Sequence, residues 1–203
     1  MSPLRTLFGP SRETIWRQLA AELDAEYAPG GFFKSGAVRL AHGEWTLTLD
    51  TYVVSTGKTV IVFTRMRAPY VNPGGFRFNI YRRGFFSDLA KRFGMQDIEI
   101  GHPDFDRDFI IKSSDEGKVK RLLADGRLRS LIALQPQIHL EVKDREGRFG
   151  PDFPEDTDEL CFHVTGVIKD VPRLKQLFEL FAETLDELCR MGAAYERAPD
   201  IKL

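Results

Sequence analysis

The sequence is poor in cysteine, and this shortage argues against a disulfide-stabilised secreted protein. Cys161 and Cys189 are the only cysteines among 203 residues, and neither stands in a CxxC pair. A secreted framework normally needs more cysteines than this. We therefore expect two reduced thiols in a cytoplasmic protein.

The sequence also lacks long apolar runs and an excess of either charge. No stretch is long and apolar enough for a signal peptide or a membrane span, so we expect no membrane contact. The formal net charge is -1, whereas general nucleic-acid binders are normally clearly basic. What is abundant is phenylalanine, with 16 residues, which predicts an aromatic-rich core.

The first half of the chain predicts a helix followed by an antiparallel meander. The helix begins after Ser11 as N-cap and ends at Pro29-Gly30-Gly31. Its apolar residues recur at helical spacing: Ile15, Trp16, Leu19, Leu23 and Tyr27. From about Gly36 the period changes to two, and short turns at positions 42–43 and 56–57 separate four consecutive strands that end near Arg83.

The second half predicts shorter elements and one long helix. We expect a short helix over 86–93, strands near 97–100 and 108–112, helices from Asp115 and near 127–134, and strands in "QIHLEVKD" and "ELCFHVTGVIKD". A long loop, 144–158, separates the last two strands and is expected to be functional or mobile. Asp170 caps the final helix. The predicted fold class is α+β, with lobes 1–94 and 95–203 in one compact unit.

The stretch "HPDFDRDFIIKSSDEGKVKRLL" has the appearance of a metal loop, but its spacing is wrong for one. An EF-hand loop that starts at Asp104 needs glycine at 109 and glutamate at 115, where the chain has Phe109 and Asp115. In an extended segment Asp104 and Asp106 would share a solvent-facing side. Ser113 and Glu116 fit a capping box. We expect a strand that leads into a helix.

Histidine positions give no recognisable metal or catalytic site. The four histidines lack the tight spacing of zinc sites. His139 and His163 fall on strands expected to be neighbours, and His139 would share an outer face with Glu141 and Lys143. Strand-face histidines are mostly solvated surface, so we predict no metal and no cofactor. No serine or cysteine has a nucleophile's spacing to a histidine, and no catalytic residue is assigned.

A basic strand face is the one positive functional signal. If the strands "VIVFTRMRAP" and "GFRFNIYRR" pair, they gather arginines and a tyrosine on one surface: Arg65, Arg67, Arg77, Tyr81 and Arg83. Such a cluster suits phosphate, a polyanion or an acidic protein segment. The alternative is a solvated sheet face whose cations pair with carboxylates. The loop "GPDFPEDTDEL" is one source of those carboxylates, from the same chain or from a second copy.

The same acidic stretch resembles a bacterial domain family of unknown function. In that family an Asp-Pro-x-Phe-Glu-like segment leads into a strand, a polar turn and an "LL" helix. The matching positions here are Pro103, Phe105, Phe109 to Ile111, Asp115 and Leu122-Leu123. The likeness covers the second half of the chain and implies a shared fold, without an activity. Members often carry membrane segments, and this sequence departs from them there.

These observations predict a non-catalytic cytoplasmic binding or assembly module that uses the basic face for an anionic partner or for self-association. The alternative is a hydrolase or transferase acting on a phosphorylated small molecule. Its site would lie between the two lobes, with Arg65, Arg83, Asp106 and His102 within reach.

Overall fold

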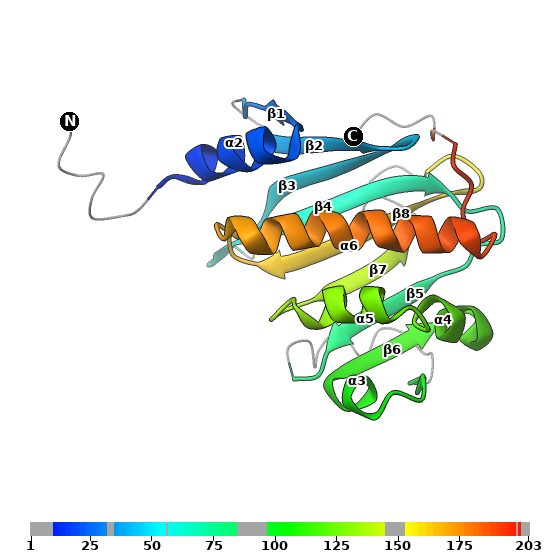
Figure 1. Cartoon of the computed structure of the whole chain (residues 1–203). Coiled ribbons are helices and arrows are strands. Elements are labelled where there is room, and N and C mark those ends of the chain that lie inside the picture. The colour runs from blue at the N-terminus through cyan, green and yellow to red at the C-terminus, as the bar shows by residue number, and fades with distance from the viewer. Residues whose placement is uncertain are drawn as a thin grey trace, which may run out of the picture.

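The computed structural model describes residues 10–31, 35–55, 57–84, 97–144, 153–197 and 199. Its elements follow one another along the chain as shown in Figure 1: α2 (Arg12–Leu23), β1 (Glu26–Ala28), β2 (Ala37–His42), β3 (Trp45–Ser55), β4 (Val60–Val71), β5 (Phe78–Arg82), α3 (Pro103–Asp108), β6 (Phe109–Ser113), α4 (Glu116–Leu122), α5 (Gly126–Ala133), β7 (His139–Lys143), β8 (Thr157–Thr165) and α6 (Val171–Arg190).

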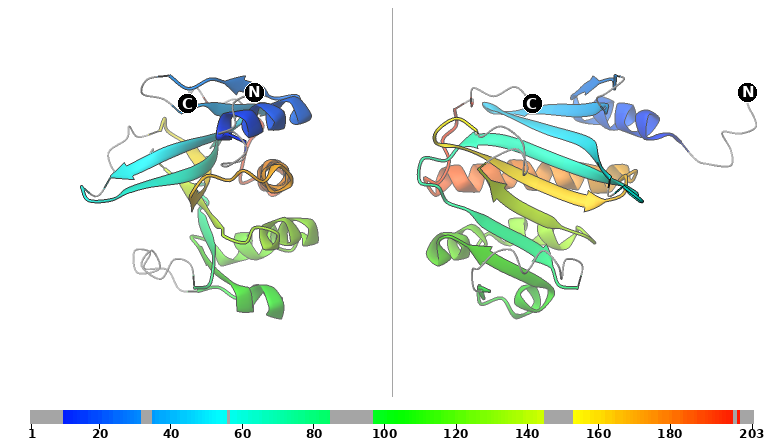
Figure 2. Two further views of the ribbon diagram at one scale, coloured as in Figure 1. Left: turned by 90° about the vertical axis from the view of Figure 1, so that its left-hand side faces the viewer. Right: turned by 180° about the vertical axis from the view of Figure 1, so that it is seen from behind.

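The strands form one eight-stranded sheet in the order β1-β2-β3-β4-β8-β7-β5-β6. Every pair of neighbouring strands is antiparallel. In the edge-on view of Figure 2 the described helices lie on one side of the sheet, and α6 crosses its middle. The predicted α+β class with an antiparallel sheet is confirmed.

Strand alternation explains why one face of the sheet packs against helices. Successive side chains of a strand point to opposite faces, and the helix-facing positions of the central strands are fully buried apolar residues such as Met66, Leu140 and Phe162. Helix α6 covers them with one apolar stripe: Leu174, Leu177, Phe178, Phe181, Leu185 and Leu188. Among the described helices, none is both long enough and apolar enough to cross a membrane.

The predicted N-caps of the first and last helices are confirmed, and the predicted end of the first helix is wrong. Ser11 caps α2, and the Asp170 side chain accepts a hydrogen bond from the Arg173 amide at the start of α6. The first helix does not reach Tyr27, because Asp24 adopts the left-handed conformation (φ 53°) and ends it. Tyr27 instead belongs to β1, which pairs with β2.

The predicted four-strand meander holds for β2, β3 and β4, but the next strand lies elsewhere. β5 pairs with β6 and β7, and strands β8 and β7 separate it from β4. Strands from both predicted lobes therefore alternate in one sheet. The predicted helix over 86–93 and the division near residue 94 fall outside the described residues, as does the middle of the 144–158 loop.

The acidic stretch forms a helix where a strand was expected. Residues Pro103–Asp108 are helical, so the aspartates do not alternate across a sheet. The Asp106 carboxylate accepts hydrogen bonds from the backbone N–H groups of Ile100, Gly101 and His102. Asp115, not Ser113, is the N-cap of α4. Asp106 thus orders the loop before α3, and the strand begins at Phe109.

Candidate functional site

The face of the sheet opposite the helices carries a row of polar residues across its central strands. Antiparallel register sets Arg67 beside Cys161, Cys161 beside Glu141, and Glu141 beside Asn79. A second row places Arg65 beside His163 and His139 beside Tyr81. Directly opposed Cβ atoms are about 5 Å apart in such a sheet, so these side chains form one continuous polar cluster.

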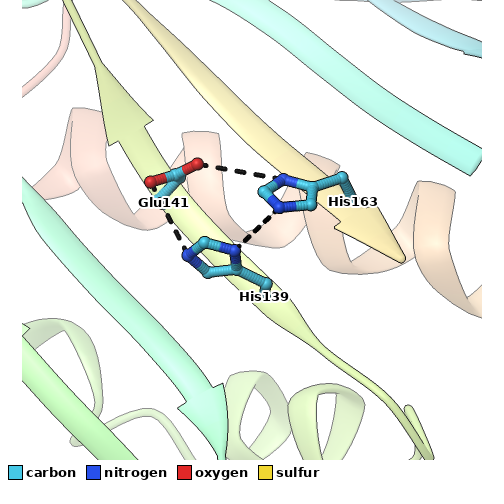
Figure 3. A group of neighbouring side chains, drawn as sticks. All are labelled: His139, Glu141 and His163. Carbon is cyan, nitrogen blue, oxygen red and sulfur yellow. Dashed lines mark hydrogen bonds and ion pairs between the residues drawn. The ribbon is translucent and has the colours of Figure 1, made fainter. Parts of the chain in front are cut away.

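His139, Glu141 and His163 meet at the centre of this cluster (Figure 3). His139 Nδ1 lies 2.9 Å from His163 Nε2. The Glu141 carboxylate lies 3.6 Å from His139 Nε2 and 3.8 Å from His163 Nδ1. One ligand atom from each residue falls within 4.8 Å of the others. Two imidazoles and a carboxylate therefore lie next to one another.

His139 and Glu141 are buried and His163 is partly buried, which corrects the prediction of a solvated strand face. His139 is 2% exposed and Glu141 is 6% exposed. Both lie on β7, in the interior of the eight-stranded sheet, where neighbouring strands flank them on each side. The sequence identified the two histidines as neighbours, and their hydrogen bond confirms that. It did not predict their burial, because the order of the central strands was not foreseen.

Burial keeps both imidazoles neutral. It lowers the pKa of His139 below its ordinary value. Burial also lowers the pKa of His163, to about 2, and the neighbouring His139, Lys143 and Arg65 contribute in the same direction. Neutral imidazole is the form that ligates a metal ion.

Lys143 and Cys161 border the three-residue cluster. Lys143 Nζ lies 3.0 Å from Glu141 Oε1 and 3.5 Å from Cys161 Sγ. Burial raises the pKa of the Cys161 thiol to about 12, so it is protonated at neutral pH. The Glu141 carboxylate is therefore the partner that holds the lysine's charge, and the pKa of Lys143 lies above its ordinary value although burial opposes it.

The predicted basic face is largely neutralised within the chain. Arg65 and Arg67 both donate to the Asp50 carboxylate, at 2.8–2.9 Å. Arg77 donates to Asp158 and Asp144, which confirms that the acidic loop supplies a carboxylate. The arginines therefore fit the alternative of internally paired cations.

The two halves of that predicted face are not adjacent. The arginines of β4 and Tyr81 of β5 share one face of the sheet, but β8 and β7 lie between them, and Arg83 lies just beyond the end of β5. The assumed pairing of the two strands is wrong, because the chain leaves β4 and enters β5 on the far side of two later strands. What fills the gap is the histidine–glutamate cluster.

The residues expected for a hydrolase or transferase acting on a phosphorylated small molecule are only partly brought together. Arg83 Nη2 donates to the Asp106 carbonyl oxygen, and His102 N donates to the Asp106 carboxylate. Arg65 lies on β4, which β8, β7 and β5 separate from the edge strand β6 beside α3. His102 instead lines a cavity of about 340 Å³ between α3 and α5.

Comparison with known proteins identifies no family. No protein-family model matches the chain, and no curated protein matches it. A structural similarity links it to the crystal structure of the mycobacterial trehalose monomycolate transport factor A, TtfA. The superposition covers 94% of this chain and 98% of that one, with 9% sequence identity and a TM-score of 0.45. A similarity of that size carries no functional argument.

Proposed function

We propose that the protein is a binding module for one transition-metal ion, held by His139, Glu141 and His163. The observation that carries the proposal is the convergence of these three ligand groups within 4.8 Å, two of them buried and His163 partly buried. Imidazole and carboxylate together suit zinc and related divalent ions. Nitrogen and oxygen ligands of a tetrahedral zinc ion lie about 3.3 Å apart. Because one ligand atom from each residue lies within 4.8 Å of the others, binding requires the side chains to move closer together and to replace the His139–His163 hydrogen bond.

The number of protein ligands indicates which kind of metal site this is. Three protein ligands leave at least one coordination position for water or another ligand, as in catalytic rather than structural zinc sites. This open position is the observation that favours the second candidate, a metal-dependent hydrolase or transferase. The proposal keeps the predicted role of a binding module, but the bound species is a metal ion and not an anion. The reason is that Arg65 and Arg67, which were expected to bind the anion, already pair with Asp50.

We also propose that the protein is cytoplasmic and that it self-associates. Cys161 and Cys189 are free thiols in the described structure, which supports a reducing, cytoplasmic setting. Self-association through the polar face stays a prediction. Native mass spectrometry of the purified protein tests it, and a mass of a single chain at micromolar concentration would contradict it.

Equilibrium dialysis against Zn²⁺ and Co²⁺, with the bound metal measured by plasma mass spectrometry, tests the metal site. We expect one ion per chain. Glu141→Gln and the double variant His139→Ala/His163→Ala should weaken binding by at least about 100-fold, because loss even of groups that only support ligands typically costs 10- to 100-fold.

The chain supplies a matched control in its other two histidines. His42 pairs with Asp186 at the surface, and His102 is exposed. The variant His42→Ala/His102→Ala should bind one ion with unchanged affinity. Equal binding by both double variants, or no ion bound by the wild type, would overturn the proposal. Circular dichroism checks that each variant is folded.

A further inference from the structure

Helices α3 and α5 lie on the same side of the sheet (Figure 2), and a cavity of about 340 Å³ lies between them. Small-molecule sites usually occupy roughly 300–1,000 Å³, so this cavity has room for one small ligand. The cluster of His139, Glu141 and His163 lies on the opposite side of the sheet, because these residues alternate with the helix-facing residues Leu140 and Phe162. The cavity is therefore separate from the proposed metal site.

The floor of this cavity is apolar. Phe105 and Phe109 line it, and their rings stack with centroids 4.4 Å apart. Both rings belong to the hydrophobic core, whereas Pro103 and Ala133, which also line the cavity, are exposed to solvent. Transfer of an apolar group from water onto such a surface is favourable. The cavity therefore favours a ligand with an apolar body.

Arg129 supplies a positive charge on the α5 side of the cavity. Its Nη1 donates to the Leu123 carbonyl oxygen, and no carboxylate of the described residues pairs with it. A Cβ added to Gly126, another lining residue, would lie 3.7 Å from Arg129 Nη2, so the guanidinium lies beside the first turn of α5. A guanidinium has five N–H donors in a planar fork. The remaining donors can bind a carboxylate at two points.

Two aspartates on the α3 side restrict the charge of the ligand. Asp104 and Asp108 line the cavity, but Arg107 already pairs with both, at 2.8 and 3.0 Å. A cationic ligand would have to compete with Arg107 for these carboxylates. A dianion such as phosphate would meet two carboxylates and a single lining cation, Arg129. Repulsion and attraction therefore balance best for a ligand with one negative charge.

We propose that this cavity binds a small organic monocarboxylate. Its apolar body, of about the size of a benzene ring, rests on Phe105 and Phe109, and Arg129 binds its carboxylate. The site goes beyond the proposed metal function and does not depend on it. It also gives a role to the acidic stretch, because α3 forms one wall of the cavity.

Ligand-detected NMR titration of the chelator-treated full chain with benzoate tests the proposal. Chelation removes any contribution from a metal. We expect saturable binding with a Kd of about 1 mM or lower, which is modest for a ligand of this size. Benzyl alcohol, which has the ring without the charge, should bind about 10-fold more weakly, because it lacks the hydrogen bond between charged groups. Inorganic phosphate should not displace benzoate at equal concentration.

Arg129→Met tests the cation, and Arg127 on the same helix supplies the control. Arg127 lies outside the residues that line the cavity and pairs with Glu179. Benzoate affinity should fall about 10-fold in Arg129→Met, with the affinity for benzyl alcohol unchanged. Arg127→Met should change neither affinity. Equal benzoate affinity in the two variants overturns the role of Arg129.

Ala133→Leu tests the location without altering a charge, because the larger side chain fills part of the cavity. Benzoate and benzyl alcohol should both bind at least about 10-fold more weakly, since overpacking a small site excludes its ligand. Ala124→Leu is the same change at an exposed alanine outside the cavity and should have no effect. Circular dichroism checks that the variants are folded.

Each contrary result overturns a defined part of the proposal. No saturable benzoate binding by the wild type, or equal binding by Ala133→Leu and Ala124→Leu, overturns the site. Benzyl alcohol that binds as tightly as benzoate, or phosphate that displaces it, overturns the choice of a monocarboxylate. None of these results bears on the metal function, which dialysis of the metal-loaded chain tests separately.

Discussion

Arg65 donates two parallel hydrogen bonds to the Asp50 carboxylate across the β3–β4 hairpin, from Nε at 2.9 Å and from Nη2 at 2.8 Å. Arg67 donates to the same carboxylate at 2.9 Å. Asp50 is 7% exposed. One buried carboxylate thus organises two cations on the face that the sequence presented as basic.

Asp50→Asn should destabilise the fold by about 3 kcal/mol, because it removes the charge that compensates two poorly hydrated guanidinium groups. Urea denaturation followed by circular dichroism measures the change. The control is Glu13→Gln, which breaks the exposed Glu13–Arg17 pair and should change stability by no more than about 0.5 kcal/mol. Similar losses in the two variants would show that Asp50 is an ordinary surface carboxylate.

The helices and strands are set by the spacing of apolar residues within short segments, and this spacing was sufficient to predict most of them. Strand alternation placed His139 and Glu141 on one face, and helical spacing placed Leu174 and Leu188 on one stripe of α6. Asp170 was recognisable as a cap because its position relative to Pro172 suffices. Where the determinant lies within a few residues, the sequence alone predicts it.

Strand order and burial depend on contacts between distant segments, so local patterns do not contain them. Nothing near β4 or β5 indicates that β8 and β7 separate them. The same insertion buries His139 and partly buries His163, although both were expected at the surface. Charge pairing also depends on contacts between strands. The sequence did not reveal that Arg65 is paired, because its partner Asp50 lies on another strand.

Phe162→Ala should cost about 4 kcal/mol, because it opens a cavity where β8 packs under the helices. The residue is fully buried at the centre of the sheet. Val60→Ala is the control, since Val60 is 67% exposed near the end of the β3–β4 hairpin and should change stability by no more than about 0.5 kcal/mol. Denaturation midpoints that fall equally would contradict the placement of Phe162 in the core.

Asp170→Ala should lower stability by about 1 kcal/mol through loss of the N-cap of α6. The Asp170 side chain accepts a 2.7 Å hydrogen bond from the Arg173 amide. Asp170→Asn keeps an acceptor in the same place and should retain most of the stability. Thermal unfolding of the three proteins in parallel distinguishes capping from a general effect of charge: an asparagine variant as weak as the alanine variant would rule out capping.

Asp158 should give an unusual pH dependence of stability. Burial raises its pKa above the ordinary value of 3.8, although Arg77 and Asn72 oppose the shift. Between the ordinary and the raised pKa, the unfolded chain is ionised at this residue while the folded chain holds the proton. The contribution of Asp158 therefore falls as the pH rises through that interval. Asp158→Asn should remove this slope, and denaturation from pH 3 to 7 measures it; identical slopes would contradict the shift.

Zn²⁺ should stabilise the fold by mass action, because the three ligands come together only when β7 and β8 are paired. At free zinc about 100 times the dissociation constant, the gain is about 2.7 kcal/mol. For a chain of this size that corresponds to a rise in Tm of about 5–10 °C, and a chelator should reverse it. The variant His139→Ala/His163→Ala should show no rise, whereas His42→Ala/His102→Ala should respond as the wild type does. A rise shared by all three proteins would place zinc elsewhere on the chain, since the second pair lies outside the cluster.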